Sequence, residues 1–107
     1  MAKRIYISGP MTGVVDCRGK FDFAENRLVE KGYKVINPAY VDDVMPNAEY
    51  EEYMEVDMLL LSTCDAIYML KGWENSRGAN REYGYALAKG MEIMFELPAE
   101  GKKEGES

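Results

Sequence analysis

Short runs of β-branched and aromatic residues alternate with segments of helical periodicity along this chain of 107 residues. The alternation predicts strands at 3–8, 33–36, 66–70 and 92–97 and helices at 20–31, 47–63 and 76–90. This order favours a mostly parallel sheet, because each crossover helix brings the chain back to run in the same direction. We therefore expect residues 1–97 to form one α/β domain, a three-layer sandwich with helices on both faces of a four- to five-stranded sheet.

Glycine, proline and one serine mark the ends of the predicted elements. Gly9-Pro10 closes the first strand and opens a polar loop, and Asn37-Pro38 ends the second strand. Residues 38–47 are expected to form another loop. Ser76 is a candidate N-cap for the last helix, and Gly90 is its expected C-terminal stop.

The composition removes several kinds of chemistry. The chain has no histidine, and its two cysteines, Cys17 and Cys64, stand alone in the sequence. The usual zinc spacings and every histidine-based triad are therefore absent. We expect no metal and no cofactor, and any acid–base chemistry must come from carboxylates, Tyr, Lys or Cys.

Charge and hydropathy restrict the possible partners. The 19 acidic residues outweigh 13 basic ones, which gives a net charge of −6 without a basic tract, so binding to nucleic acid is not expected. The apolar runs are too short to cross a bilayer, and the first four residues lead straight into a strand. We expect a cytoplasmic protein that does not bind membranes, with a flexible tail at 98–107.

A strand order of 2-1-3-4 would place a ligand crevice at one edge of the sheet. In flavodoxin-like and Rossmann-like sheets, ligands bind beyond the carboxyl ends of the strands, at the point where the strand order reverses. Here that point lies between the first and third strands. The loops 9–19 and 71–76 are expected to face each other there, with Trp73 either stacked on a base or covering the end of the sheet.

Two carboxylates interrupt apolar helix stripes. Glu82 lies among the core-facing positions of the third predicted helix, and Asp57 lies among those of the second. Because Glu82 falls within the first two turns, the helix dipole is expected to favour its ionised form. A structural interpretation stays open for both: Glu82 paired with Arg77 or Arg81, and Asp57 bonded to Tyr or Lys side chains. A straight helix that starts near Asn47 places Asp57 about 15 Å along its axis, below the crevice, whereas a start near Glu51 or a break around Glu55 would bring it to the crevice.

Four motifs fall at spacings that are specific when taken together. They are YISGPMTG at 6–13, Asn37-Pro38, Asp57 placed eight residues before Asp65, and SRGANREYGYALAKG at 76–90. With these motifs the chain resembles the nucleoside 2-deoxyribosyltransferase superfamily. That superfamily includes a 2′-deoxynucleoside 5′-phosphate N-hydrolase branch and short phage-borne members.

The resemblance implies a catalytic role for three residues. Glu82 is the implied nucleophile, Asp57 acts on the leaving base, and Tyr6 orients the nucleophile. Ser76 lies six residues before Glu82, where the monophosphate hydrolases have a serine that contacts phosphate. The candidate substrate-binding residues are Gly9, Pro10, Met11, Ser76, Gly78, Trp73 and Arg18. The resemblance also implies a homo-oligomer that needs no cofactor.

The expected activity is cleavage of the N-glycosidic bond of a 2′-deoxynucleoside or its 5′-monophosphate, by hydrolysis or by transfer to another base. Pro10 and Met11 stand where the hydrolase branch has a serine and an arginine-bearing loop, which leaves Arg18, Arg77 or Arg81 as substitutes. The alternative is a non-catalytic nucleotide-binding or interaction module on the same fold.

Overall fold

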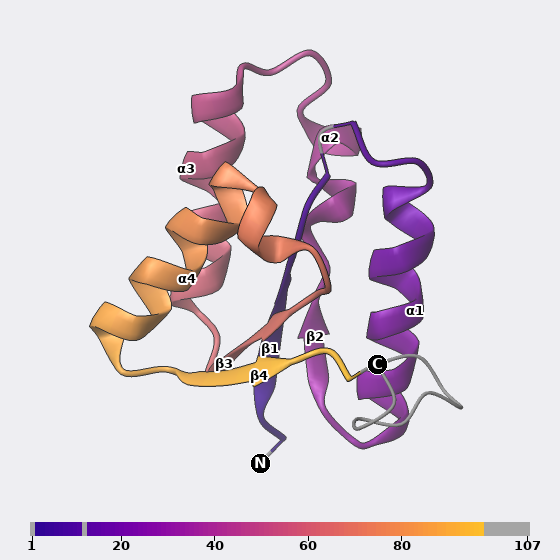
Figure 1. Ribbon diagram of the computed structural model, residues 1–107, viewed down its shortest axis with the longest axis vertical. Helices are drawn as coiled ribbons and strands as arrows, with labels where there is room; N and C mark the ends of the chain where they lie inside the picture. The colour runs from indigo at the N-terminus through magenta and orange to yellow at the C-terminus, as the bar shows by residue number, and fades with distance from the viewer. Residues whose placement is uncertain (1, 12, 98–107) are drawn as a thin grey trace.

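The strand β1, Arg4–Ser8, lies inside a parallel sheet and pairs with a neighbour on each side. The computed structural model describes residues 2–11 and 13–97, and its sheet has the order β2-β1-β3-β4 (Figure 1). The other strands are β2 Lys34–Ile36, β3 Ala66–Met69 and β4 Glu92–Phe95. All three pairings are parallel, so the predicted α/β Rossmann-like fold and its strand order are confirmed.

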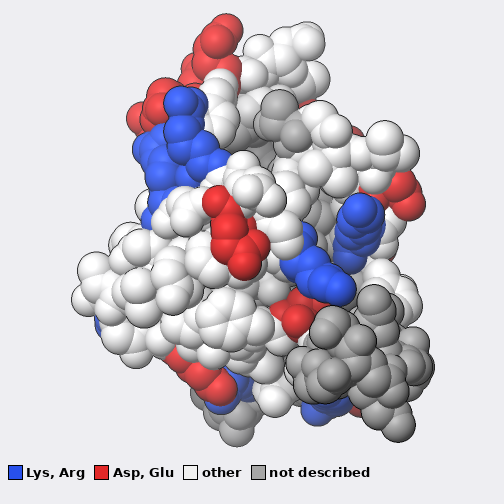
Figure 2. Space-filling model, in the orientation of Figure 1, with Lys and Arg blue, Asp and Glu red and all other residues white. Residues whose placement is uncertain are grey.

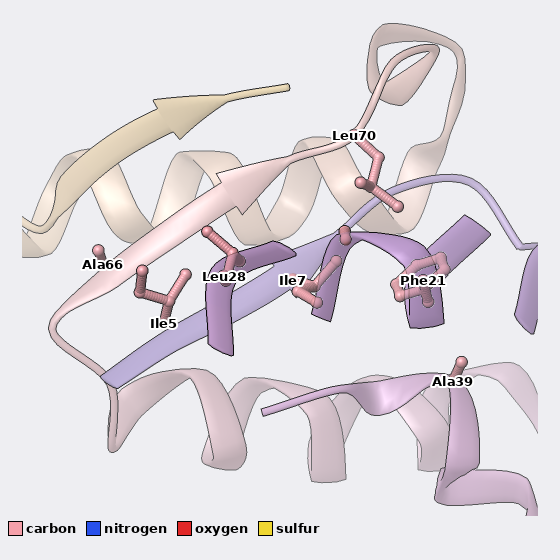
Figure 3. Packing of buried hydrophobic residues seen from close by; sticks show 8 residues of the cluster. Ile5, Ile7, Phe21, Leu28, Ala39, Ala66 and Leu70 are labelled. Carbon is pink, nitrogen blue, oxygen red and sulfur yellow. The ribbon is translucent and has the colours of Figure 1, made fainter. Parts of the chain in front are cut away.

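The alternation of side chains along β1 creates two cores, one on each face of the sheet. Ile5 and Ile7 pack under helix α1, Cys17–Glu30, whose apolar positions fall on one face. Figure 3 shows this packing, in which Phe21 and Leu28 of α1 lie over β1. Tyr6 points the other way, into a cluster formed with the helices α3, Tyr50–Ser62, and α4, Arg77–Lys89. In Figure 1 α1 lies on one side of the sheet, and α3 and α4 lie on the other.

The segment after β2 contains helical turns, so the loop predicted for 38–47 was wrong for residues 38–44. It forms a 3₁₀ turn, η1 Pro38–Tyr40, followed by one turn of helix, α2 Val41–Val44. Asn37 caps this turn by accepting a hydrogen bond from the backbone N–H of Ala39. Four helical residues are too few to produce a periodic apolar stripe, which is why the sequence pattern missed them.

The helix ends follow capping groups more closely than apolar periodicity. Helix α1 starts three residues before the predicted 20–31, because Asp16 caps it and accepts from the N–H of Gly19. Helix α3 starts at Tyr50, where Glu52 reaches back to the N–H of Glu49.

The predicted boundaries of α4 are confirmed. Ser76 caps its start by accepting from the N–H of Ala79, and Gly90 ends it in the left-handed conformation with φ 77°. Leu87 falls in the apolar stripe of this helix but is 55% exposed. A further 3₁₀ turn, η2 Trp73–Asn75, links β3 to α4.

Acidic and basic side chains are interspersed on the face shown in Figure 2. Arg81 of α4 forms an ion pair with Glu51 of α3. None of the helices in the described ranges is long and apolar enough to cross a bilayer. The predicted tail at 98–107 lies outside the described residues.

Candidate active site

A pocket of about 830 Å³ opens at the carboxyl end of β1, where the strand order reverses. Its walls come from the loop after β1, the first turn of α1, the segment after β2, and the N-terminal halves of α3 and α4. Eight of the ten predicted site residues line it: Gly9, Pro10, Met11, Arg18, Asp57, Ser76, Gly78 and Glu82. The fold thus brings together segments that are far apart in the sequence.

Glu82 projects from the inner face of α4 and is held by two hydroxyl groups of β1. Tyr6 donates to its Oε2 and Ser8 to its Oε1, each at 2.6 Å. Tyr6 and Ser8 are two residues apart, so the strand places both side chains on the same face of the sheet. The alternative pairing of Glu82 with an arginine was wrong, because Arg81 bonds to Glu51 instead.

Burial raises the pKa of Glu82 to about 7, although the hydrogen bonds from Ser8 and Tyr6 oppose this effect. The helix dipole was expected to favour the ionised form of Glu82, but burial is the largest effect on its pKa and acts in the opposite direction. Glu82 is the sixth residue of α4, beyond the first turn where the free N–H groups act. Burial and the charge of Glu82 also raise the pKa of Tyr6, which keeps its phenol protonated as a donor.

Asp57 reaches the same pocket from α3. Because that helix starts at Tyr50, Asp57 is only seven residues from its beginning and lines the pocket instead of lying below it. Burial and then the charge of Glu82 raise the pKa of Asp57 to about 7. Its Oδ1 is buried and has no hydrogen-bond partner in the described part of the chain, so no Tyr or Lys satisfies that oxygen.

Two predicted site residues do not line this pocket. Tyr6 is fully buried behind Glu82, which suits the orienting role that the resemblance implies. Trp73 packs its ring 4.6 Å from that of Tyr83 and 6.3 Å from that of Phe95. It borders a separate hollow of about 220 Å³, so its position matches the covering interpretation and not base stacking.

Arg18, Arg77 and Arg81, the three arginines that could bind a phosphate, differ in the acidic side chains that already pair with them. Arg18 binds Asp42 and Asp43, and its guanidinium lies 4.3 Å from the ring centre of Tyr40. Arg81 is paired with an acid of α3. Arg77 lines the pocket, lies 4.7 Å from the ring centre of Tyr50, and forms no ion pair among residues 2–11 and 13–97.

Sequence reasoning missed two polar groups of the site. From the sequence, Ser8 was only the last residue of a strand. In the structure it is 1% exposed and donates a hydrogen bond to Glu82. The alternation Tyr6-Ile7-Ser8, with two hydroxyls on one face, was the available signal. Tyr50 lines the pocket with a buried hydroxyl that has no partner in the described ranges.

The glycine at position 78 allows close packing in the pocket wall beside Tyr50. A Cβ at this position would lie 3.3 Å from the sulfur of Met54 and 3.5 Å from the hydroxyl of Tyr50. Glycine therefore lets the first turn of α4 approach α3 closely. No group of three Cys, Asp or Glu side chains in the described residues is arranged to hold a metal ion.

The chain matches one family model, over residues 3–95. This stretch contains all four strands, the three long helices and every residue of the pocket. None of the curated proteins gives a match. The match covers most of the chain, which therefore belongs to the family described as domain of unknown function DUF4406.

Proposed function

We propose that this protein cleaves the N-glycosidic bond of a 2′-deoxynucleoside or its 5′-monophosphate, with Glu82 as the nucleophile. The observation that carries the proposal is the pair of buried carboxylates in one pocket. Glu82 is held at both oxygens by hydroxyl groups, while Asp57 keeps one buried oxygen without a partner. The resemblance to the nucleoside 2-deoxyribosyltransferase superfamily assigns the same two residues.

The first step uses the two acids in opposite protonation states. Glu82 attacks the anomeric carbon as a carboxylate, and the N-glycosidic bond breaks with its electron pair on the base nitrogen. Asp57 donates its proton to the departing base and becomes a carboxylate. The products of this step are a glycosyl ester of Glu82 and a free base.

The raised pKa values suit this division of labour. Because Asp57 and Glu82 both titrate near 7 and repel each other as anions, the pair holds about one proton around neutral pH. The first step moves the single negative charge from Glu82 to Asp57, so the pocket carries one charge before and after. No second anion has to be stabilised in this buried site.

The second step regenerates the enzyme. Water attacks the anomeric carbon, Asp57 takes a proton from that water, and Glu82 leaves as a carboxylate. A second base can replace water, and the product is then a new nucleoside. Hydrolysis and transfer thus share the same two carboxylates and differ only in the acceptor.

The start of α4 favours a substrate with a 5′-phosphate. The first N–H groups of this helix point along its positive dipole end, where anions bind readily. Arg77 lies beside them without an ionic partner in the described chain, and Ser76 offers a hydroxyl. The pocket is also lined by apolar side chains, Pro38, Val41 and Met54, which suit a sugar or base.

The test is release of free base, followed by chromatography, from a panel of 2′-deoxynucleosides and their 5′-monophosphates. Base release by the wild type that is lost in Glu82→Ala supports the proposal. Glu55→Ala is the matched control, because Glu55 is an exposed acid on α3. If no member of the panel loses its base while calorimetry detects binding, the proposal fails and a nucleotide-binding module is favoured.

A further inference from the structure

Ser8 holds the same carboxylate as Tyr6, but from a different depth of the fold. Ser8 is the last residue of β1 and pairs with Met69 at the carboxyl end of the sheet. The next residue, Gly9, lines the pocket, whereas neither Ser8 nor Tyr6 does. Tyr6 lies two residues back along the strand, about 6.6 Å further from that edge.

This difference in depth distinguishes the two oxygens of Glu82. Oε1 is bonded to the donor nearer the carboxyl edge of the sheet, Ser8, and Oε2 is bonded to the deeper donor, Tyr6. A substrate that enters from the carboxyl edge reaches the end of the strand that carries Ser8 before the position of Tyr6.

We propose that Ser8 is a positioning residue that presents Oε1 of Glu82 to the anomeric carbon, while Tyr6 keeps hold of Oε2 throughout the reaction. This inference rests on the proposed N-glycosidic cleavage. It assigns the attacking oxygen, and it gives the two β1 hydroxyls different tasks.

The chemistry of the glycosyl ester supports this division. When Oε1 bonds to the anomeric carbon, the bond to the base breaks and Asp57 protonates the base, so Oε1 becomes an ester oxygen and a poor acceptor. Oε2 becomes the carbonyl oxygen and remains a good acceptor for Tyr6. The hydrogen bond from Ser8 to Oε1 therefore has to break when the ester forms, whereas the hydrogen bond from Tyr6 to Oε2 has to remain.

The two side chains differ in how easily they withdraw. The hydroxyl hydrogen and oxygen of Ser8 reorient by rotation about a single side-chain bond. The ring of Tyr6 is fully buried in the core between the sheet, α3 and α4, so its phenol cannot retreat without disturbing that packing. Ser8 is thus suited to the attacking oxygen and Tyr6 to the retained one.

Ser8 also affects the protonation of Glu82. The groups that face this carboxyl are Ser8 and Tyr6 from β1, Asp57 from α3 and, at longer range, Arg81 on its own helix. The hydrogen bond from Ser8 lowers the pKa of Glu82 and partly offsets its burial. Loss of this bond therefore reduces the fraction of Glu82 that is ionised near neutral pH.

The experiment compares wild type, Ser8→Ala and Ser62→Ala. Ser62 is the matched control, because its hydroxyl bonds only to the carbonyl of Leu59 at the far end of α3. We expect kcat for base release to fall about 10- to 100-fold in Ser8→Ala, with KM changed less than about twofold. We also expect the acid limb of the pH–rate profile to move to higher pH, which a purely structural role would not cause.

Two further measurements separate the possible failures. NMR titration of ¹³C-labelled glutamate in the unliganded protein reads the pKa of Glu82 directly, and we expect Ser8→Ala to raise it. Ser8→Cys keeps the shape of the side chain with a weaker donor, so its kcat should fall between those of the other two. Circular dichroism confirms that each variant is folded.

The wild type could be active while a folded Ser8→Ala has the same pH–rate profile and the same Glu82 pKa as the wild type. That result would overturn the role of Ser8 and leave the proposed function standing. A wild type that releases no base overturns the proposed function, and the inference about the attacking oxygen with it.

Discussion

Replacement of Glu82 by glutamine should remove the contribution of Glu82 to the pH dependence of stability between pH 5 and pH 8. An ordinary glutamate has a pKa of 4.5, and burial raises the pKa of Glu82 to about 7. Between these values the folded protein keeps a proton that the unfolded chain has lost. The free energy of unfolding therefore falls as the pH rises through this interval.

The size of the effect follows from the two pKa values. The difference between the folded pKa of about 7 and the unfolded pKa of 4.5 corresponds to about 3 kcal/mol in total. Most of this is lost between pH 5 and pH 8, since the unfolded glutamate is already mostly ionised at pH 5. Small domains are stable by only about 5–15 kcal/mol, so this loss is easily measured. Asp57 acts in the same direction, because its pKa is also raised.

Urea unfolding followed by circular dichroism at pH 5, 6, 7 and 8 gives the required free energies. Wild type should lose stability steadily over this range, while Glu82→Gln should lose about 2–3 kcal/mol less and keep the loss that Asp57 contributes. Glu55→Gln removes a charge from an exposed position and should follow the wild type. Parallel curves for wild type and Glu82→Gln would refute the reasoning, because they would mean that the buried carboxyl titrates as it does in the unfolded chain.

Three other substitutions test the site and its support. Asp57→Asn removes the proton donor and should slow base release by about 100-fold or more, measured by chromatography. Arg77→Ala should raise KM for a 5′-monophosphate about tenfold and leave KM for the nucleoside unchanged. Gly9→Ala places a Cβ 2.8 Å from that of Leu70 and should lower the free energy of unfolding in urea by about 1–3 kcal/mol. Equal KM changes for both substrates, or an unaffected Gly9→Ala, would contradict these assignments.

The fold could be predicted because it depends on regular patterns. Phe21, Ala24 and Leu28 recur at helical spacing in the sequence, and all three are buried on one face of α1. The strand order followed from the parallel crossovers, and it placed the ligand crevice where the pocket lies. The buried face of a helix and the order of the strands both depend on regularities, periodicity and chirality, that extend over whole helices and strands.

The parts that could not be predicted depend on single long-range contacts. Ser8 is buried because Glu82, 74 residues away, packs onto the end of β1. Arg18 loses its availability to a ligand because a helical turn that the sequence pattern missed brings Asp42 and Asp43 to it. No local spacing encodes such partners, so their roles appear only once the elements are assembled.

The way the site handles charge connects its electrostatics to the proposed reaction. Glu82 is hydrogen-bonded to two neutral hydroxyls and not to an arginine, so burial disfavours its ionised form in the unliganded protein. During N-glycosidic cleavage the sugar passes through an oxocarbenium-like state that carries positive charge. That charge would stabilise the negative charge that passes from Glu82 to Asp57, and this negative charge would stabilise the sugar in return. The attraction between the carboxylate charge and the sugar is strongest while the N-glycosidic bond is breaking. An interaction of this kind stabilises the transition state more than the substrate.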